Sequence, residues 1–93
     1  MHYAIAHLTV SDPEKLAAYR EKAPEALAKH GGKIETATAE FTTLDGAPYA
    51  PQVAAILSFP TKDAAIAWAN DPELSDIHAL RQGAGQADTL LLG

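Results

Sequence analysis

The chain has 93 residues and no cysteine, and its seven Lys and Arg against twelve Asp and Glu give a net charge of -5. This length fits one small domain. The missing cysteines exclude disulfides, thiolate nucleophiles and thiolate metal sites, and the acidic balance with scattered cations argues against nucleic-acid binding. No apolar run approaches the roughly 20 residues that cross a bilayer, and the first residues lack a signal-peptide pattern. We therefore expect no membrane association and a cytoplasmic location.

The first part of the chain predicts a strand followed by a long helix. Tyr3–Val10 is a run of small and β-favouring residues of strand length. Asp12-Pro13-Glu14 is typical of a helix start, with the aspartate as N-cap and the proline at the first helical position. We expect this helix to extend to about Lys29, to bend at Pro24 and to end at His30-Gly31-Gly32, where a glycine can adopt the left-handed conformation.

The rest of the chain predicts three further strands and a helical region broken in two. A loop rich in proline follows Asp45-Gly46, and the Asp-Pro-Glu helix start recurs at Asp71-Pro72-Glu73. The expected elements are strands over Lys33–Leu44, Gln52–Phe59 and Ala87–Leu92, a helix from its cap Thr61 to about Ala69, and a short helix over Pro72–Gln82. The order β-α-β-β-α-β predicts one α+β domain over residues 1–93 with a ferredoxin-like fold, a four-stranded antiparallel sheet with helices on one face.

The strands are apolar on both faces, which predicts a homodimer. Val53–Leu57 is continuously apolar, and the last strand carries Leu90, Leu91 and Leu92 in succession. The helices can cover only one face of the sheet, and an apolar face left bare favours association. We therefore expect the sheets of two copies to face each other. The alternative is that the small alanines make the second face tolerably exposed.

Five short stretches, in this order along the chain, carry a resemblance to a known family. They are Ala18-Tyr19-Arg20-Glu21-Lys22, His30-Gly31-Gly32, Phe59-Pro60, Leu80-Arg81-Gln82-Gly83-Ala84 and the end near Leu92-Gly93. The chain resembles domain of unknown function 1330 (DUF1330), within the dimeric α/β-barrel superfamily. The resemblance implies a barrel-like dimer but no settled activity, since related branches include small monooxygenases, haem-degrading enzymes and lactone isomerases. Two positions depart from the family: Leu74 replaces a usual tyrosine, and Tyr49 stands in for the tryptophan that is usual in the loop after Asp45-Gly46.

Two candidate catalytic residues share one stripe of the first helix. Leu16, Tyr19, Ala23, Leu27 and His30 fall on one side at 100° per residue, so a phenol and an imidazole face the sheet. They could present a hydroxyl and a proton-transfer group to a pocket between helix and sheet. Alternatively, Tyr19 is a core aromatic and His30 caps the helix C-terminus, where a cation is favoured.

Arg81 is the best candidate for binding an anion. On the short helix it shares a face with Leu74, Ile77 and His78, so a guanidinium lies in an otherwise apolar stripe. Burying such a charge without a partner costs several kcal/mol. It therefore pairs either with an internal carboxylate or with an anionic ligand, and the family resemblance also includes this position.

Two other residues, His7 and Asn70, carry open alternatives. His7 is an acid–base group if its face of the first strand points into the dimer cavity, and an interface residue otherwise. Asn70 is a turn residue between two helices, or, as the family resemblance suggests, a residue that lines a pocket. Trp68 is expected to pack in the core.

The sequence leaves two functions open. The four histidines have no ligand spacing, and no nucleotide-binding or nucleophile-elbow motif occurs, so we expect neither a metal nor a cofactor; haem would rest on superfamily analogy alone. The first hypothesis is a cofactor-free enzyme or binder for a small, mostly apolar molecule that bears a carboxylate or enolate. The alternative is a non-enzymatic dimeric module that binds a metabolite or another protein.

Overall fold

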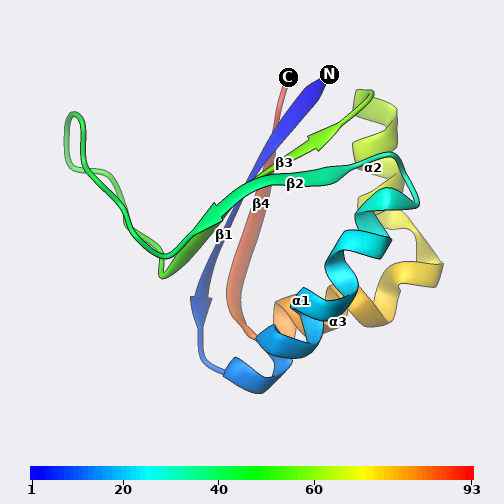
Figure 1. Ribbon diagram of the computed structural model, residues 1–93, viewed down its shortest axis with the longest axis horizontal. Helices are drawn as coiled ribbons and strands as arrows, with labels where there is room; N and C mark the ends of the chain where they lie inside the picture. Colours follow the sequence, from blue (N-terminus) through cyan, green and yellow to red (C-terminus); the bar gives the residue numbers. More distant parts are fainter.

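The computed structural model describes residues 1–93 and contains one antiparallel sheet with its helices on one side (Figure 1). The strands lie in the order β2-β3-β1-β4. The strands are β1 (His2–Val10), β2 (Lys33–Thr38), β3 (Val53–Phe59) and β4 (Gly85–Leu92), and the helices are α1 (Pro13–Ala28), α2 (Lys62–Asn70), the 3-10 turn η1 (Pro72–Leu74) and α3 (Ser75–Gly83). The ferredoxin-like fold is confirmed. The sheet is open within one chain, because its edge strands β2 and β4 do not pair with each other.

Short-range contacts explain why the helices begin and end where predicted. The side chain of Asp12 accepts a hydrogen bond from the backbone N–H of Lys15, and that of Thr61 accepts one from Ala64. At the end of α1, Gly31 has φ of 73°, and the N–H of Gly32 donates to the carbonyl of Leu27 at 2.8 Å. This is the left-handed glycine cap expected at that position. The helix continues through Pro24.

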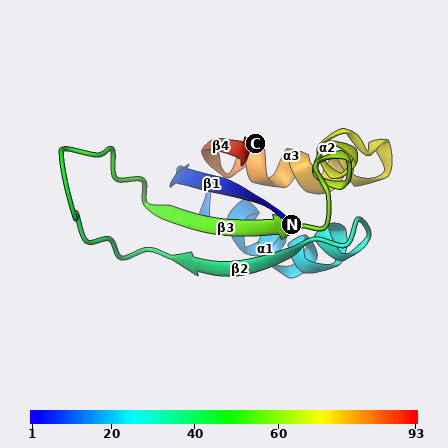
Figure 2. The same cartoon turned by 90° about the horizontal axis from the view of Figure 1, so that it is seen from above.

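Two predicted strand ends are wrong. The second strand stops at Thr38 rather than Leu44, because it pairs only with β3 and its last partner is Ala54. The chain before that partner contains Pro51, which cannot donate to a ladder. The segment 39–52 therefore extends away from the sheet in both views (Figures 1 and 2).

The last strand begins at Gly85 rather than Ala87. Gly85 pairs with Val10, and a Cβ atom at this position would lie 1.8 Å from the carbonyl oxygen of Thr9. Glycine at this position therefore allows β4 to approach β1 closely.

The core lies between the helices and one face of the sheet. Ala4, Leu57 and Phe59 from the strands pack with Leu27, Trp68 and Leu74 from the helical layer, and all six are less than 10% exposed. None of the helices is long and apolar enough to span a membrane.

The helices leave the opposite face of the sheet uncovered, and within the chain the loop residue Tyr49 contacts it at Thr9 and His7. Strand alternation places there a set of residues that we call the outer face: Tyr3, Ile5, His7, Ile56, Leu90 and Leu92. Leu90 is 67% exposed and Leu92 50%. Apolar side chains thus lie on both faces, although the outer face also carries polar residues such as Ser58, Gln86 and Asp88, and the main core lies on the helix side.

Candidate functional site

Arg81 lies between aromatic rings from two other helices. Its guanidinium carbon is 5.6 Å from the ring centroid of Tyr19 on α1 and 5.2 Å from that of Trp68 on α2. Both distances are within the range of cation–π attraction. The helical stripe predicted from the sequence accounts for this placement, since Leu74 and His78 on the same face of the helical region are buried and Arg81 is half-buried.

A short chain of hydrogen bonds holds one end of this guanidinium. Nη1 of Arg81 lies 3.0 Å from Nδ1 of His78 and 3.4 Å from the hydroxyl of Tyr19. On its other side, His78 Nε2 lies 2.8 Å from the backbone carbonyl of Trp68. No side-chain hydrogen bond uses Nε or Nη2 of Arg81, and neither atom is buried without a partner. Both therefore remain open to solvent or to a ligand.

Arg81 has no carboxylate partner. The ion pairs of the chain involve other residues. An internal carboxylate was one of the two partners expected for this charge, and the single chain does not provide it.

Two cavities meet at Arg81 and Trp68. The inner cavity, of about 140 Å³, lies between α1, α3 and the sheet, and its mostly apolar wall includes Leu16, Tyr19 and Leu57. The edge cavity, of about 390 Å³, lies between α2, α3 and the strands β1 and β4, and includes Ile66, Gln82 and Leu91. The inner cavity is thus largely apolar, with Arg20 and Arg81 in its wall, whereas the edge cavity also carries the polar residues Gln82, Asp88 and Thr89 beside Arg81.

Trp68 packs in the core, as expected, between Phe59 and His78. The centroid of the Trp68 ring lies 5.5 Å from that of Phe59 and 4.8 Å from that of His78. Its indole Nε1, however, is buried without a hydrogen-bond partner. A buried unpaired donor is uncommon in folded proteins, and this one belongs to a residue that lines both cavities.

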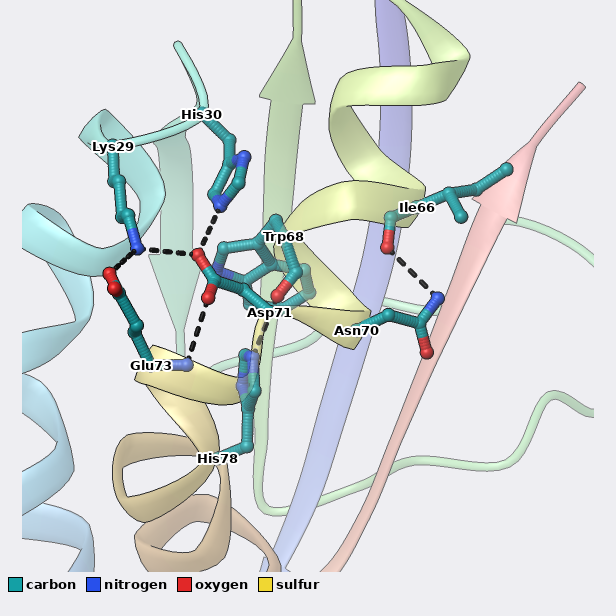
Figure 3. A network of polar contacts seen from close by, with 8 residues as sticks. All are labelled: Lys29, His30, Ile66, Trp68, Asn70, Asp71, Glu73 and His78. Carbon is teal, nitrogen blue, oxygen red and sulfur yellow. Dashed lines mark hydrogen bonds and ion pairs between the residues drawn. The ribbon is translucent and has the colours of Figure 1, made fainter.

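His30 belongs to a separate ionic network at the C-terminal end of α1 (Figure 3). Its Nε2 is 2.8 Å from Oδ2 of Asp71, and Nζ of Lys29 is 2.7 Å from the same oxygen. Lys29 also pairs with Glu73, and the other oxygen of Asp71 accepts from the N–H of Glu73 at 2.9 Å. Hydrogen bonds from Lys29 and His30 hold the pKa of Asp71 well below its ordinary value, and the pKa of Lys29 is raised by its bonds to Asp71 and Glu73.

The structure does not bring Tyr19 and His30 together. Eleven residues of helix separate them by about 16 Å, and each contacts a different partner, Arg81 for Tyr19 and Asp71 for His30. Tyr19 is in the wall of the inner cavity and His30 is in neither cavity wall, so the two groups do not face one pocket within the chain.

His7 and Asn70 also lie away from Arg81. The imidazole of His7 is on the outer face, with Nδ1 4.0 Å from Oδ2 of Asp88 and its ring 5.9 Å from that of Tyr49. Asn70 is exposed, and its amide donates to the carbonyl of Ile66 at 3.0 Å (Figure 3). Asn70 is in the wall of neither cavity.

A family model covers the whole chain. It is the model of the domain of unknown function DUF1330, and it matches residues 1–93. The chain belongs to the DUF1330 family. No curated protein matches it.

Solved structures show the fold of this DUF1330 domain. A protein of unknown function from Rhodopseudomonas palustris has a TM-score of 0.73 at 18% identity, over 98% of this chain and 79% of its own. A dimeric ferredoxin-like protein of unknown function from Jannaschia sp. CCS1 has a TM-score of 0.72 at 10% identity, over 99% and 97%. SnoaB, a cofactor-independent oxygenase from Streptomyces nogalater, has a TM-score of 0.64 at 12% identity, over 99% and 89%.

Sequence reasoning missed two groups of residues in this DUF1330 domain. It recognised Asp71 only as part of a helix start, although the carboxylate also binds Lys29 and His30. It placed His78 beside Arg81 on one helix face without predicting their hydrogen bond. The spacing of three residues was the available signal for that contact, because side chains three apart are neighbours on a helix.

Proposed function

We propose that this DUF1330 domain binds a small, mostly apolar molecule that bears a carboxylate or enolate, with Arg81 as the anion anchor. The observation that carries the proposal is the open Nε/Nη2 edge of Arg81 at the junction of two cavities. This edge carries parallel N–H groups that match the two oxygens of a carboxylate.

The charge of Arg81 is only partly compensated inside the chain. Contact with the rings of Tyr19 and Trp68 offsets about 0.5–2 kcal/mol of its desolvation, while a half-buried cation without a counter-ion remains costly. A bound carboxylate would supply the missing charge. The Tyr19 hydroxyl, 3.4 Å from Nη1, is the nearest proton donor for an oxygen of the same ligand.

The cavities favour a ligand with one anionic end and a compact apolar body. Binding sites for small molecules are typically about 300–1,000 Å³. The edge cavity, of about 390 Å³, is within that range, and the inner cavity, of about 140 Å³, is smaller. The inner wall is mainly Ala, Leu, Val and aromatic side chains, and the edge wall adds Asp88 and Thr89 to such residues, so Arg81 would recognise the anion and the inner cavity the apolar body.

Whether a reaction follows binding is a second step of the proposal. SnoaB, an oxygenase of similar fold, is described as cofactor-independent, which supports a cofactor-free reaction by analogy of fold alone. In this chain Tyr19 is the candidate catalytic residue beside Arg81. His7 also belongs to the wall of the inner cavity, although its ring packs near Tyr49, while His30 and Asn70 are in neither cavity wall. The alternative, a non-enzymatic binding module, is favoured by this lack of an assembled acid–base pair.

We also propose that the domain is a homodimer joined through its outer face. The exposed leucines and Ile5 on that face support it, and the Jannaschia protein of the same fold is described as dimeric. In such a dimer His7 and Tyr49 would meet the second copy.

Calorimetric titration with benzoate tests the anion site, and benzamide serves as the uncharged matched ligand. We expect benzoate to bind and benzamide to bind at least about tenfold more weakly, since a bond between charged groups is worth more than one to a neutral amide. Arg81→Leu should abolish benzoate binding, while Arg81→Lys, which keeps the charge without the fork, should weaken it. Lys62→Met, which removes an exposed cation on α2, is the control and should bind as the wild type does.

Thermal melting of the same variants separates a ligand anchor from a structural cation. If Arg81 serves a ligand, Arg81→Leu should melt at or above the wild-type temperature, because a poorly compensated charge has been removed. A melting temperature of Arg81→Leu below that of the wild type, together with no binding of benzoate by the wild type, would overturn the proposal and leave Arg81 a structural residue.

A further inference from the structure

We infer that His78 is the positioning residue of the anion site: as a neutral imidazole protonated on Nε2, it holds Nη1 of Arg81 so that the Nε/Nη2 edge is left for the ligand. The inference deepens the proposed function and rests on it. Its basis is the chain of contacts from the Trp68 carbonyl through His78 to Arg81.

The two neighbours of His78 allow only one protonation state. Nε2 faces the carbonyl oxygen of Trp68 at 2.8 Å, and a carbonyl can only accept, so Nε2 must carry a proton. Nδ1 faces the guanidinium of Arg81 at 3.0 Å, and a guanidinium can only donate, so Nδ1 must be bare. Both contacts are satisfied by the neutral Nε2–H tautomer and by no other form.

Packing keeps the imidazole in this orientation. His78 is 7% exposed, and its ring meets the indole of Trp68 edge to face at 4.8 Å. Trp68 therefore fixes the histidine twice, through its carbonyl and through its ring. The acceptor Nδ1 is thus presented to Arg81 from a rigid support.

The orientation of Arg81 decides which of its donors reach a ligand. A guanidinium has five N–H groups. His78 and the Tyr19 hydroxyl occupy both hydrogens of Nη1, which leaves the single hydrogen of Nε and the two of Nη2. Nε and Nη2 form the side edge that grips a carboxylate with two parallel bonds.

A neutral acceptor has a further consequence for the charge of the site. An aspartate or glutamate at this position could also hold Nη1, but it would neutralise the guanidinium and compete with an incoming anion. The imidazole orients the group and leaves its positive charge available. No carboxylate pairs with Arg81, so its charge is left for the ligand.

Two substitutions separate positioning from packing. In His78→Asn, the side-chain oxygen stands near the place of Nδ1 and can still accept from Arg81. In His78→Gln, the amide extends to the place of Nε2 and can still donate to the Trp68 carbonyl, but nothing accepts from Arg81 at the place of Nδ1. We expect His78→Asn to keep benzoate affinity within about threefold of the wild type and His78→Gln to lose roughly tenfold or more.

Melting temperatures of both variants complete the comparison. A residue that only fills space would lower both melting temperatures and change benzoate affinity equally in the two variants, and that result would overturn the inference. Equal benzoate affinity in wild type, His78→Asn and His78→Gln would overturn it too, while leaving the Arg81 site intact.

The nitrogen chemical shifts of His78 give a readout that needs no ligand. We expect a neutral ring with the proton on Nε2 near neutral pH. A Nδ1–H tautomer or a charged imidazolium would refute the positioning role even if benzoate binds. Conversely, a neutral Nε2–H ring in a protein that binds no benzoate would refute the proposed function while confirming the contacts of His78.

Discussion

Replacing Leu90 by Glu should separate the proposed dimer into monomers that remain folded. Leu90 lies on the outer face, opposite Ile5 of β1, and is 67% exposed in the single chain. The core of one chain therefore does not need it. If two outer faces meet, however, both copies of Leu90 become buried in the interface.

The structure gives the size of the effect. Full burial of a leucine side chain is worth about 1.5–3 kcal/mol, and Leu90 has 67% of its surface left to bury, so each copy contributes about 1–2 kcal/mol. A symmetric interface contains the residue twice, which makes about 2–4 kcal/mol, or roughly 30- to 700-fold in the dissociation constant. The carboxylate of Glu adds a desolvation cost, so the measured factor should lie at the upper end or beyond.

Sedimentation equilibrium over a concentration series measures this constant. We expect the wild type to sediment as two chains of 9.8 kDa, about 20 kDa together, and Leu90→Glu as one. Ile66→Glu is the matched control, because Ile66 is 46% exposed but lies on α2, on the helix side. A wild type that stays at the mass of one chain, or a dimer broken by Ile66→Glu and untouched by Leu90→Glu, would refute the reasoning.

Two further substitutions test the framework around the site. Asp71 has a lowered pKa in the folded chain, so its contribution to stability is complete above the ordinary carboxyl pKa of 3.8 and is lost as the pH falls from there towards the folded pKa. In urea unfolding, Asp71→Asn should therefore reduce the loss of unfolding free energy at acid pH. Asp45→Asn, in the exposed loop, should leave that loss unchanged. Gly85→Ala should lower the free energy of unfolding by at least about 2 kcal/mol, because its Cβ would lie 1.8 Å from the carbonyl oxygen of Thr9. In the control Gly46→Ala the new Cβ meets no atom, but φ is 74°, so the loss should be about 1 kcal/mol. Equal losses in thermal or urea unfolding would contradict a close approach of β4 to β1 at Gly85.

The fold could be predicted because its signals are local. The caps at Asp12, Thr61 and Gly31 depend on contacts within a few residues, and a single sequence contains all the groups involved. Strand ends depend on a partner elsewhere in the chain. Leu44 continues an alternating pattern but has no partner strand, so the predicted length of β2 was wrong.

The candidate site was predictable only one helix at a time. Helical periodicity placed Tyr19 on the inner side of α1 and Arg81 on the inner side of α3. That these two side chains meet, 62 positions apart, depends on how the helices are rotated and spaced on the sheet. The contact between His30 and Asp71, which are 41 positions apart, could not be predicted for the same reason, because the sequence around one residue does not show that the other lies beside it.

The distribution of charge is the strongest argument that Arg81 faces outward to a ligand rather than inward to the fold. Carboxylates outnumber Lys and Arg by twelve to seven, and two of those cations pair with them, Lys29 with Asp71 and Glu73 and Lys33 with Glu35. The other unpaired cations, Lys15, Arg20, Lys22 and Lys62, are exposed to solvent, whereas Arg81 is half-buried. The one cation set between two aromatic rings receives none and contacts His78 instead. A fold selected only for stability would gain by replacing such a group with an apolar side chain. We propose that an anion from solution is the partner that would make this arrangement favourable, and the benzoate titration tests for it directly.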